Sequence, residues 1–328
     1  MSEKIRIALD MAGGDNAPDV CLRGAKLALE EDSKIEILAV GRPEVVDALS
    51  QENERITAVH ATEIIEMGDH PVDAIRSKKD SSIVVGAKLV KFGEADGFFS
   101  AGSTGACLAA ATLITGRIKG VKRPAIGAVL PAYKHPVLLI DVGANADCRP
   151  EMLIQFAKMG SAYATQMMRV ENPKIGLLNI GSEETKGSAL AVDSFAELNR
   201  NFENFVGNCE GSDLLTGEVD VVVTDGFSGN VALKSVEGAG KYMMKVLKDA
   251  FLSGMTTKLA ALLMKPQLKE MKSKLDSEAQ GGSPLLGVKG AFVIGHGSSG
   301  ARGIKNGILE TAKTVRCDVT GCIERAMS

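Results

Sequence analysis

The sequence predicts an α/β fold, an α/β/α sandwich around a mostly parallel, Rossmann-like central sheet with a protruding helical hairpin. Short apolar runs alternate with helix-length segments along most of the 328 residues, which is typical of βαβ units. Runs such as 137–140 are continuously apolar, which fits strands covered on both faces. The 36 glycines gather at the ends of these runs, where turns need a permissive backbone.

The alternation gives the elements in order, within one domain that spans residues 1–328. Strands are expected at 5–9, 35–40, 97–99, 125–130, 137–140, 174–179, 219–224 and 291–294. Helices are expected between them, among others at 20–31, 43–50, 105–115, 152–169 and 229–252. Ligands of such sheets bind beyond the carboxyl ends of the strands, so the residues after each strand are the first place to look for a site.

Composition excludes several classes of protein. A net charge of −3 gives no reason to expect nucleic-acid binding. The six cysteines form no CxxC pair and no metal-ligand spacing, so we expect reduced thiols, no metal and no cofactor. No signal peptide precedes the first strand, and no apolar run approaches the ~20 residues of a membrane span. We therefore expect a cytoplasmic protein.

Six of the expected strands end in glycine with Ser, Thr, Asn or Asp. Such turns bring backbone N–H groups close to an anion, and the following helix adds the positive end of its dipole. We expect the six turns to share one sheet edge and to bind phosphate, although a single turn of this kind can equally be a helix cap. The predicted binding residues are Gly13, Gly14, Asp15, Ser100, Gly102, Ser103, Thr104, Asp141, Asn145, Asn179, Ser182, Asp225, Gly229, His296 and Ser298.

Two residues of these turns suggest catalytic chemistry. Lys186, in the turn GSEETKG, could offset phosphate charge, or it could be an exposed lysine at a helix start. Asn230 could donate its amide to a developing oxyanion, or it could be a capping asparagine. His296 is the one histidine at a strand end, and nothing in the sequence pairs it with an activated Ser or Cys. GxSxG and HExxH are absent, which argues against a serine hydrolase or a zinc protease.

Residues 241–275 interrupt the α/β alternation. They hold eight lysines against two acidic residues, a local charge of +6 that leaves −9 for the rest of the chain. Met244, Leu247 and Phe251 lie at helical spacing, and Gly254 and Pro266 divide the segment into short helices. A basic amphipathic arm suits an anionic membrane surface or an acidic partner protein. The alternative is a dimer-forming hairpin whose lysines are merely solvated.

Seven strings occur in order along nearly the whole chain: 10–15 (DMAGGD), 100–106 (SAGSTGA), 116–125 (GRIKGVKRPA), 141–146 (DVGANA), 178–184 (LNIGSEE), 225–231 (DGFSGNV) and 282–287 (GSPLLG). Together they closely resemble the PlsX-type phosphate acyltransferases. This family is related in fold to phosphotransacetylases and, more distantly, to isocitrate and isopropylmalate dehydrogenases. Departures are small, with Ala12 and Ser283 in place of more usual residues.

The resemblance implies that long-chain acyl-[acyl carrier protein] and inorganic phosphate react to acyl phosphate and free carrier protein. The product would feed a glycerol-3-phosphate acyltransferase in phospholipid synthesis. The resemblance also implies that Lys186 and Asn230 are the catalytic residues, and that the protein is a homodimer peripherally associated with the inner face of the cell membrane. Alternatives are a coenzyme A-dependent phosphotransacetylase, a dehydrogenase of the related fold, or a membrane-associated scaffold for lipid enzymes.

Overall fold

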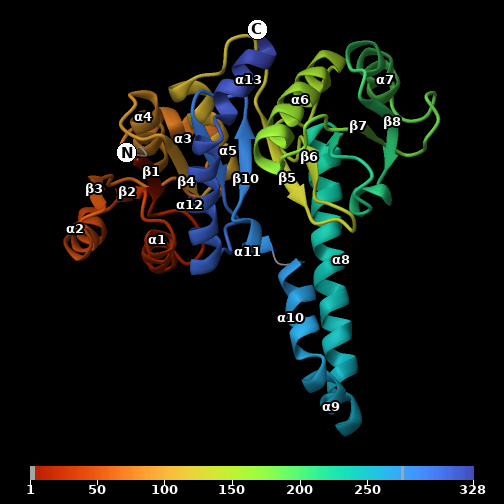
Figure 1. Cartoon of the computed structure of the whole chain (residues 1–328). Helices are drawn as coiled ribbons and strands as arrows, with labels where there is room; N and C mark the ends of the chain where they lie inside the picture. The colour runs from red at the N-terminus through yellow and green to blue at the C-terminus, as the bar shows by residue number, and fades with distance from the viewer. Residues whose placement is uncertain (1–3, 275–276) are drawn as a thin grey trace.

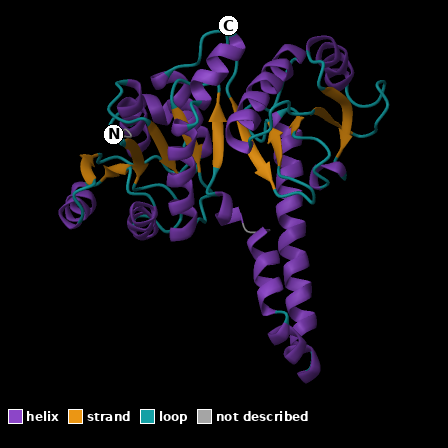
Figure 2. Cartoon of the chain, viewed as in Figure 1, coloured by secondary structure: helices purple, strands orange, loops and turns teal. Residues whose placement is uncertain are grey.

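The computed structural model describes residues 4–274 and 277–328. Within these residues one sheet of eleven strands has the order β3-β2-β1-β4-β11-β10-β5-β6-β9-β7-β8, and helices cover both of its faces (Figures 1 and 2). The strands are β1 (Ile5–Asp10), β2 (Ile35–Gly41), β3 (Ile56–His60), β4 (Gly97–Ser100), β5 (Ala125–Leu130), β6 (Val137–Ile140), β7 (Ile175–Asn179), β8 (Phe205–Glu210), β9 (Val221–Val223), β10 (Ser283–Leu286) and β11 (Ala291–Ile294).

Strand direction divides the sheet into two parallel blocks. Strands β3, β2, β1, β4 and β11 are parallel to one another, and so are β6, β9, β7 and β8. Between the blocks, the pairs β11–β10, β10–β5 and β5–β6 are antiparallel. Three reversals leave the two blocks running in opposite directions. The predicted mostly parallel sheet is confirmed, but the expectation that six turns share one edge is wrong.

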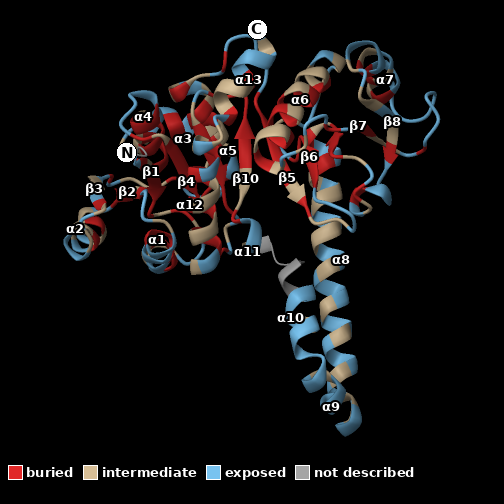
Figure 3. Ribbon diagram, in the orientation of Figure 1, coloured by how far each residue is buried: buried red, intermediate tan, exposed pale blue. Residues whose placement is uncertain are grey.

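Helices of both layers bury the apolar side chains of the sheet (Figure 3). One layer packs α4, α5 and the adjoining helical turn against side chains such as Phe98 and Phe292, whose ring centroids lie 5.6 Å apart. The other layer contains α1, α12, α6 and α13. The bounds are α1 (Asp19–Glu31), α2 (Pro43–Glu52), α3 (Pro71–Ser77), α4 (Ser82–Lys91), α5 (Thr104–Ala110), α6 (Pro150–Tyr163), α7 (Ala189–Asn201), α11 (Ser277–Gln280), α12 (Ala301–Arg316) and α13 (Val319–Met327), with short helical turns at Ala111–Thr115, Ala164–Met168 and Asp213–Leu215.

The predicted hairpin is present and protrudes from the body (Figure 1). Helix α8 (Gly226–Leu252) leads outward, α9 (Met255–Leu263) forms the tip, and α10 (Lys265–Lys274) returns. Gly254 is the N-cap of α9, and Pro266 lies in the first turn of α10, where its missing N–H costs nothing. Leu275, the last residue of the expected arm, lies outside the described residues.

The hairpin is apolar on its inner seam and also at its tip. Met244, Leu247 and Phe251 are half-buried, as their spacing predicts. The tip helix α9 instead exposes Met255 and Leu263, at 82% and 75% of their surface, together with Leu259 and Leu262. None of the described helices combines the length and the apolar character that crossing a bilayer requires.

Candidate active site

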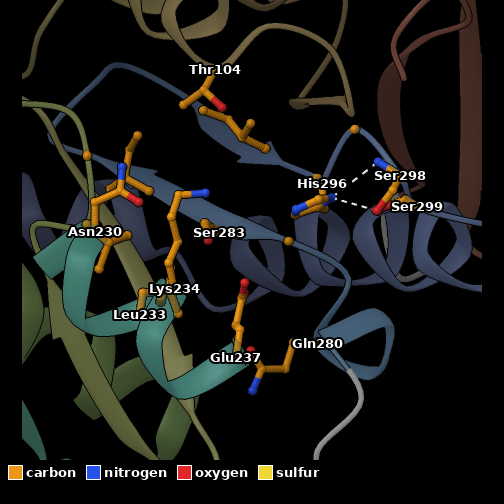
Figure 4. A pocket seen from close by; sticks show the side chains of 18 of the residues that line it. Thr104, Asn230, Leu233, Lys234, Glu237, Gln280, Ser283, His296, Ser298 and Ser299 are labelled. Atoms are coloured by element: carbon orange, nitrogen blue, oxygen red, sulfur yellow. Dashed lines mark hydrogen bonds between the residues drawn. The ribbon is translucent and has the colours of Figure 1, made fainter. Parts of the chain in front are cut away.

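A cleft of about 530 Å³ lies against the central antiparallel strands, between the two parallel blocks. Ile126 and Ala128 of β5, Ser283 of β10 and Ile294 of β11 line its floor. One wall is formed by the start of α5 and the loop after β11, and the opposite wall by α8 and the loop after β6 (Figure 4). Groups from both blocks therefore face one cavity although their strands run in opposite directions.

Buried hydrogen bonds tie together the loops of the first wall. The Ser100 hydroxyl donates to Asp10 Oδ2 at 2.6 Å, and the Gly102 N–H donates to Ser100 Oγ at 3.0 Å. The Asp15 N–H donates to the Gly297 carbonyl at 2.8 Å. Burial raises the pKa of Asp10, and hydrogen bonds from the Ser100 and Ser82 side chains and from the backbone of Ala12 and Gly13 partly offset that effect. The loops after β1, β4 and β11 thus form one platform.

The packing of this platform accounts for several of the residues predicted in the turns after β1 and β4. A Cβ on Gly13 would lie 2.7 Å from the Gly102 nitrogen, so glycine is needed for the loops to meet. Ser103 caps α5, because its Oγ accepts a hydrogen bond from the Ala106 N–H. Gly102 and Thr104 line the cleft itself. Gly13, Gly14, Asp15, Ser100 and Ser103 lie outside its lining.

The second wall is organised around the buried carboxylate of Asp141. Its Oδ1 accepts hydrogen bonds from the N–H groups of Ile126, Gly143 and Ala144 at 3.0–3.1 Å. Its Oδ2 accepts from the backbone and side-chain nitrogens of Asn145 at 2.8 and 2.9 Å. Burial raises the pKa of Asp141, and these donors counteract the rise. Asp141 and Asn145, both predicted as binding residues, hold the loop and lie outside the lining.

Glycines fit the first turn of α8 against this loop. A Cβ on Gly229 would lie 1.9 Å from the Asp141 carbonyl oxygen, a distance that no side chain tolerates. Asp225 caps the helix by accepting the Ser228 N–H at 2.8 Å. A Cβ on Gly143 would lie 3.2 Å from Asn230 Nδ2, so the loop approaches the amide closely. Predicted residues Asp225 and Gly229 therefore position Asn230, which does line the cleft.

Helix α8 also contributes residues that sequence reasoning missed. Lys234, Glu237 and Lys241 line the cleft after Asn230 (Figure 4). Their offsets of four, seven and eleven from Asn230 match one face of a helix. Because the sequence already placed Asn230 in the site at the start of a helix, this spacing could have predicted the three residues.

His296 lies in the loop after β11 and lines the cleft with Ser298. Its Nδ1 lies 2.8 Å from Ser298 Oγ and accepts the Ser298 N–H at 3.2 Å. Ser298 is therefore a hydrogen-bond partner of His296 that the sequence did not indicate. Because Nδ1 acts as an acceptor, the proton of the neutral ring belongs on Nε2, which faces away from Ser298 and into the cleft (Figure 4).

The turn after β7 lies apart from the cleft. Two strands, β6 and β9, separate β7 from the floor strand β5. Lys186 Nζ is 4.0 Å from Glu183 Oε1, and the lysine side chain is 52% exposed. Asn179 donates from Nδ2 to the Lys186 carbonyl at 3.0 Å, and Ser182 is exposed. Lys186, Asn179 and Ser182 do not line the cleft, so their predicted roles stay predictions.

The cysteines do not contribute to the cleft. All six lie within the described residues and are free thiols. Burial raises the pKa of Cys107 to about 12 and that of Cys148 to about 11. Both therefore stay protonated near neutral pH, as expected of structural thiols.

The fold resembles that of known acyl-transferring enzymes. A phosphotransacetylase from Streptococcus pyogenes superposes with a TM-score of 0.62 at 16% identity, covering 96% of this chain and 95% of that chain. A branched-chain phosphotransacylase from Enterococcus faecalis gives 0.61 at 16% identity, covering 95% of this chain and 99% of that one. The sheet, with a cleft between its two blocks, thus defines an α/β protein of the phosphotransacetylase fold.

Sequence comparison names the family. Residues 5–321 match the family model described as "Fatty acid synthesis protein". A phosphate acyltransferase from Bacillus licheniformis is 46% identical over 321 residues, 98% of this chain and 97% of its own length. Another from Desulfitobacterium hafniense is 47% identical over 324 residues, 98% and 96% of the two chains. The chain therefore belongs to the phosphate acyltransferases of fatty acid and phospholipid synthesis, as the sequence motifs predict.

Proposed function

We propose that the chain transfers a long-chain acyl group from the thioester of acyl carrier protein to inorganic phosphate. The observation that carries this proposal is the cleft, where an amide, an ammonium, an imidazole and hydroxyl groups from both blocks face one cavity. No cysteine is among the described residues that line it. Such a set of donors suits the binding of an anion beside a polarised carbonyl, with phosphate itself as the nucleophile.

The reaction is RC(O)–SR′ + HPO₄²⁻ → RC(O)–OPO₃²⁻ + R′SH. A phosphate oxygen attacks the carbonyl carbon, the C–S bond breaks, and the proton of the phosphate ends on the leaving sulfur. Asn230 Nδ2 donates to the oxygen that becomes negative in the tetrahedral intermediate. His296 Nε2–H faces the cleft and donates a hydrogen bond that stabilises the charge developing on the leaving sulfur, and the ring keeps its proton. Holding both reactants in line contributes roughly 7–11 kcal/mol of the catalytic effect.

One assay tests this function directly. Purified protein is incubated with palmitoyl-acyl carrier protein and ³²P-phosphate, and labelled acyl phosphate is measured alongside free carrier protein. We expect both products in equal amounts, and carrier release only when phosphate is present. Sustained carrier release without phosphate would instead indicate that water hydrolyses the thioester. Faster turnover of palmitoyl-coenzyme A would favour the coenzyme A-dependent alternative, and no product from either thioester would reject acyl transfer to phosphate.

The hairpin supports a proposal for where the reaction takes place. Its tip exposes Met255, Leu259, Leu262 and Leu263, and the segment carries a charge of +6. Basic apolar helices bind anionic lipid surfaces by combining apolar burial with charge attraction. We expect the homodimer to work in the cytoplasm at the inner face of the membrane and to pass acyl phosphate to a glycerol-3-phosphate acyltransferase. The acidic carrier protein is the second partner that this charge suits.

Adding charges to the tip should abolish membrane binding. The double variant Leu259→Glu/Leu262→Glu removes two apolar anchors, each worth about 1.5–3 kcal/mol when buried. We expect its affinity for phosphatidylglycerol vesicles to fall at least about 100-fold in sedimentation assays. Val206→Glu, at a 52% exposed position on the edge strand β8, is the matched control and should bind as the parent does. Equal binding of all three proteins would assign the tip to another contact.

A further inference from the structure

We infer that Lys234 forms the phosphate subsite of this cleft, where its ammonium binds the inorganic phosphate dianion. The inference rests on the proposed function and names a residue that neither the motifs nor the family relationship assigned. It differs from the untested prediction that Lys186, after β7, offsets the charge of the phosphate.

Position on α8 is the first argument. Lys234 follows Asn230 by four residues, so the two side chains leave the same face of the helix with Cβ atoms about 5–6 Å apart. Both line the same cleft, and Figure 4 shows the lysine side chain extending into it. An anion held by the ammonium would therefore lie beside the carbonyl that Asn230 polarises, which is the arrangement that attack requires.

The second argument is that the Lys234 ammonium has no partner within the described residues. No hydrogen bond or ion pair joins it to another side chain, although Glu237 lies three residues further along the helix. Some lysines at the surface of this protein have carboxylate partners, as in Lys26 with Glu52 and Lys134 with Glu218. A cation that points into a cleft without a counter-ion is available to a ligand anion.

The other charged groups of the cleft lie further along or are already engaged. Glu237 and Lys241 are about one and two turns beyond Lys234, toward the hairpin. Glu278 Oε1 accepts the Gly300 N–H at 2.7 Å. On the opposite wall Thr104 presents a hydroxyl to the cavity (Figure 4). Lys234 is thus the cation nearest to Asn230 along α8, with a hydroxyl donor across the cleft.

The chemistry favours lysine at this place. A primary ammonium is a compact charge that binds phosphate oxygens through up to three hydrogen bonds. In a partly enclosed cleft the attraction is stronger than in bulk water, because the effective dielectric constant is lower. Lys234 stands at an exposed position of α8, so replacing it with alanine removes the charge and keeps the helix.

Phosphate binding without turnover tests the subsite. Isothermal titration of inorganic phosphate into the full-length protein should give a dissociation constant about 10–100-fold weaker for Lys234→Ala than for the parent. Lys234→Arg should recover part of the affinity. In steady-state assays KM for phosphate should rise by a similar factor while KM for palmitoyl-acyl carrier protein stays within about twofold. Lys119→Ala, an exposed lysine outside the cleft, is the matched control and should match the parent.

The outcomes separate the subsite from the function. Unchanged phosphate affinity in Lys234→Ala, or an effect confined to KM for the acyl substrate, overturns the subsite even if acyl phosphate forms. Loss of binding in Lys186→Ala with full binding in Lys234→Ala transfers the role to the lysine after β7. No detectable phosphate binding by the parent also overturns it. Absence of acyl phosphate with intact, Lys234-dependent phosphate binding leaves the subsite standing and rejects the proposed reaction.

Discussion

Replacing Asn230 with alanine should lower the turnover number about 10²–10³-fold, the usual effect of removing one oxyanion donor. The amide lies at the start of α8, where Gly143 and Gly229 allow the loop after β6 to approach it closely. Its hydrogen bond strengthens only as the carbonyl oxygen gains charge. The loss should therefore appear in kcat, with KM for either substrate changed by less than about threefold. Initial rates of acyl phosphate formation at several phosphate concentrations measure both quantities.

A neighbouring serine provides the control for this prediction. Ser228 is exposed in the same turn of α8; its backbone N–H donates to the Asp225 cap, and within the described residues its hydroxyl makes no hydrogen bond. Ser228→Ala should keep the parental rate, and both variants should melt near the parental temperature. A rate for Asn230→Ala within about threefold of the parent would remove the amide from the mechanism.

Replacing Asp141 with alanine should reduce the free energy of unfolding by about 3–5 kcal/mol. The carboxylate is fully buried and accepts five hydrogen bonds from the strand β5 and from its own loop. Alanine leaves these donors without an acceptor, and each unsatisfied buried donor costs about 1–3 kcal/mol. Because the same loop seats the first turn of α8, the variant should also lose activity. Urea unfolding followed by circular dichroism measures the stability.

Two further variants serve as comparisons for the Asp141 prediction. Asp141→Asn keeps one oxygen as an acceptor, but its amide nitrogen faces the N–H of Asn145, so its stability should fall between alanine and the parent. Asp147→Ala removes an exposed carboxylate from the same loop and should be neutral. A loss below about 1 kcal/mol for Asp141→Ala would show that the loop does not depend on the carboxylate.

The sequence predicted the elements well where the pattern was strong. Buried strands such as β1 and β6 read as continuous apolar runs, and all eight predicted strands are present within two residues of their expected ends. The strands missed were β3 and β8, which lie at the edges of the sheet and are only partly buried, and β10. Pro284 lies within β10, where a proline argues against a central strand.

Strand direction could not be predicted in the same way. The apolar pattern of β5 gives its burial but not whether its neighbours are parallel to it, because both arrangements bury the same side chains. Because β10 was not predicted, two of the three antiparallel pairings, β11–β10 and β10–β5, could not be anticipated. The predicted edge therefore combined turns that the fold separates, and Lys186 was grouped with residues of the cleft.

Within the candidate site, the motifs predicted turns that form the site. They did not predict which residues of these turns line the cleft and which only hold the loops in place. Thr104, Asn230, His296 and Ser298 do line the cleft. Asp141 and Ser100 belong to turns of the site, yet they hold the loops through buried hydrogen bonds and do not line the cleft. Local sequence cannot distinguish a carboxylate that accepts backbone N–H groups from one that faces a ligand. Lys234 was missed for the opposite reason, because it lies in the middle of a helix rather than in a turn.

Helix α8 is continuous from Asn230 to Leu252, which at 1.5 Å per residue places its outer end about 33 Å from the amide. The length of α8 therefore sets the distance between the reacting thioester and any surface that the tip contacts. If the tip rests on a membrane, as proposed, the acyl phosphate has a path of that length to cover before it reaches lipid, and water hydrolyses this mixed anhydride easily. On that proposal, shortening the hairpin by whole turns should shorten the time for which the activated acyl group is exposed to water.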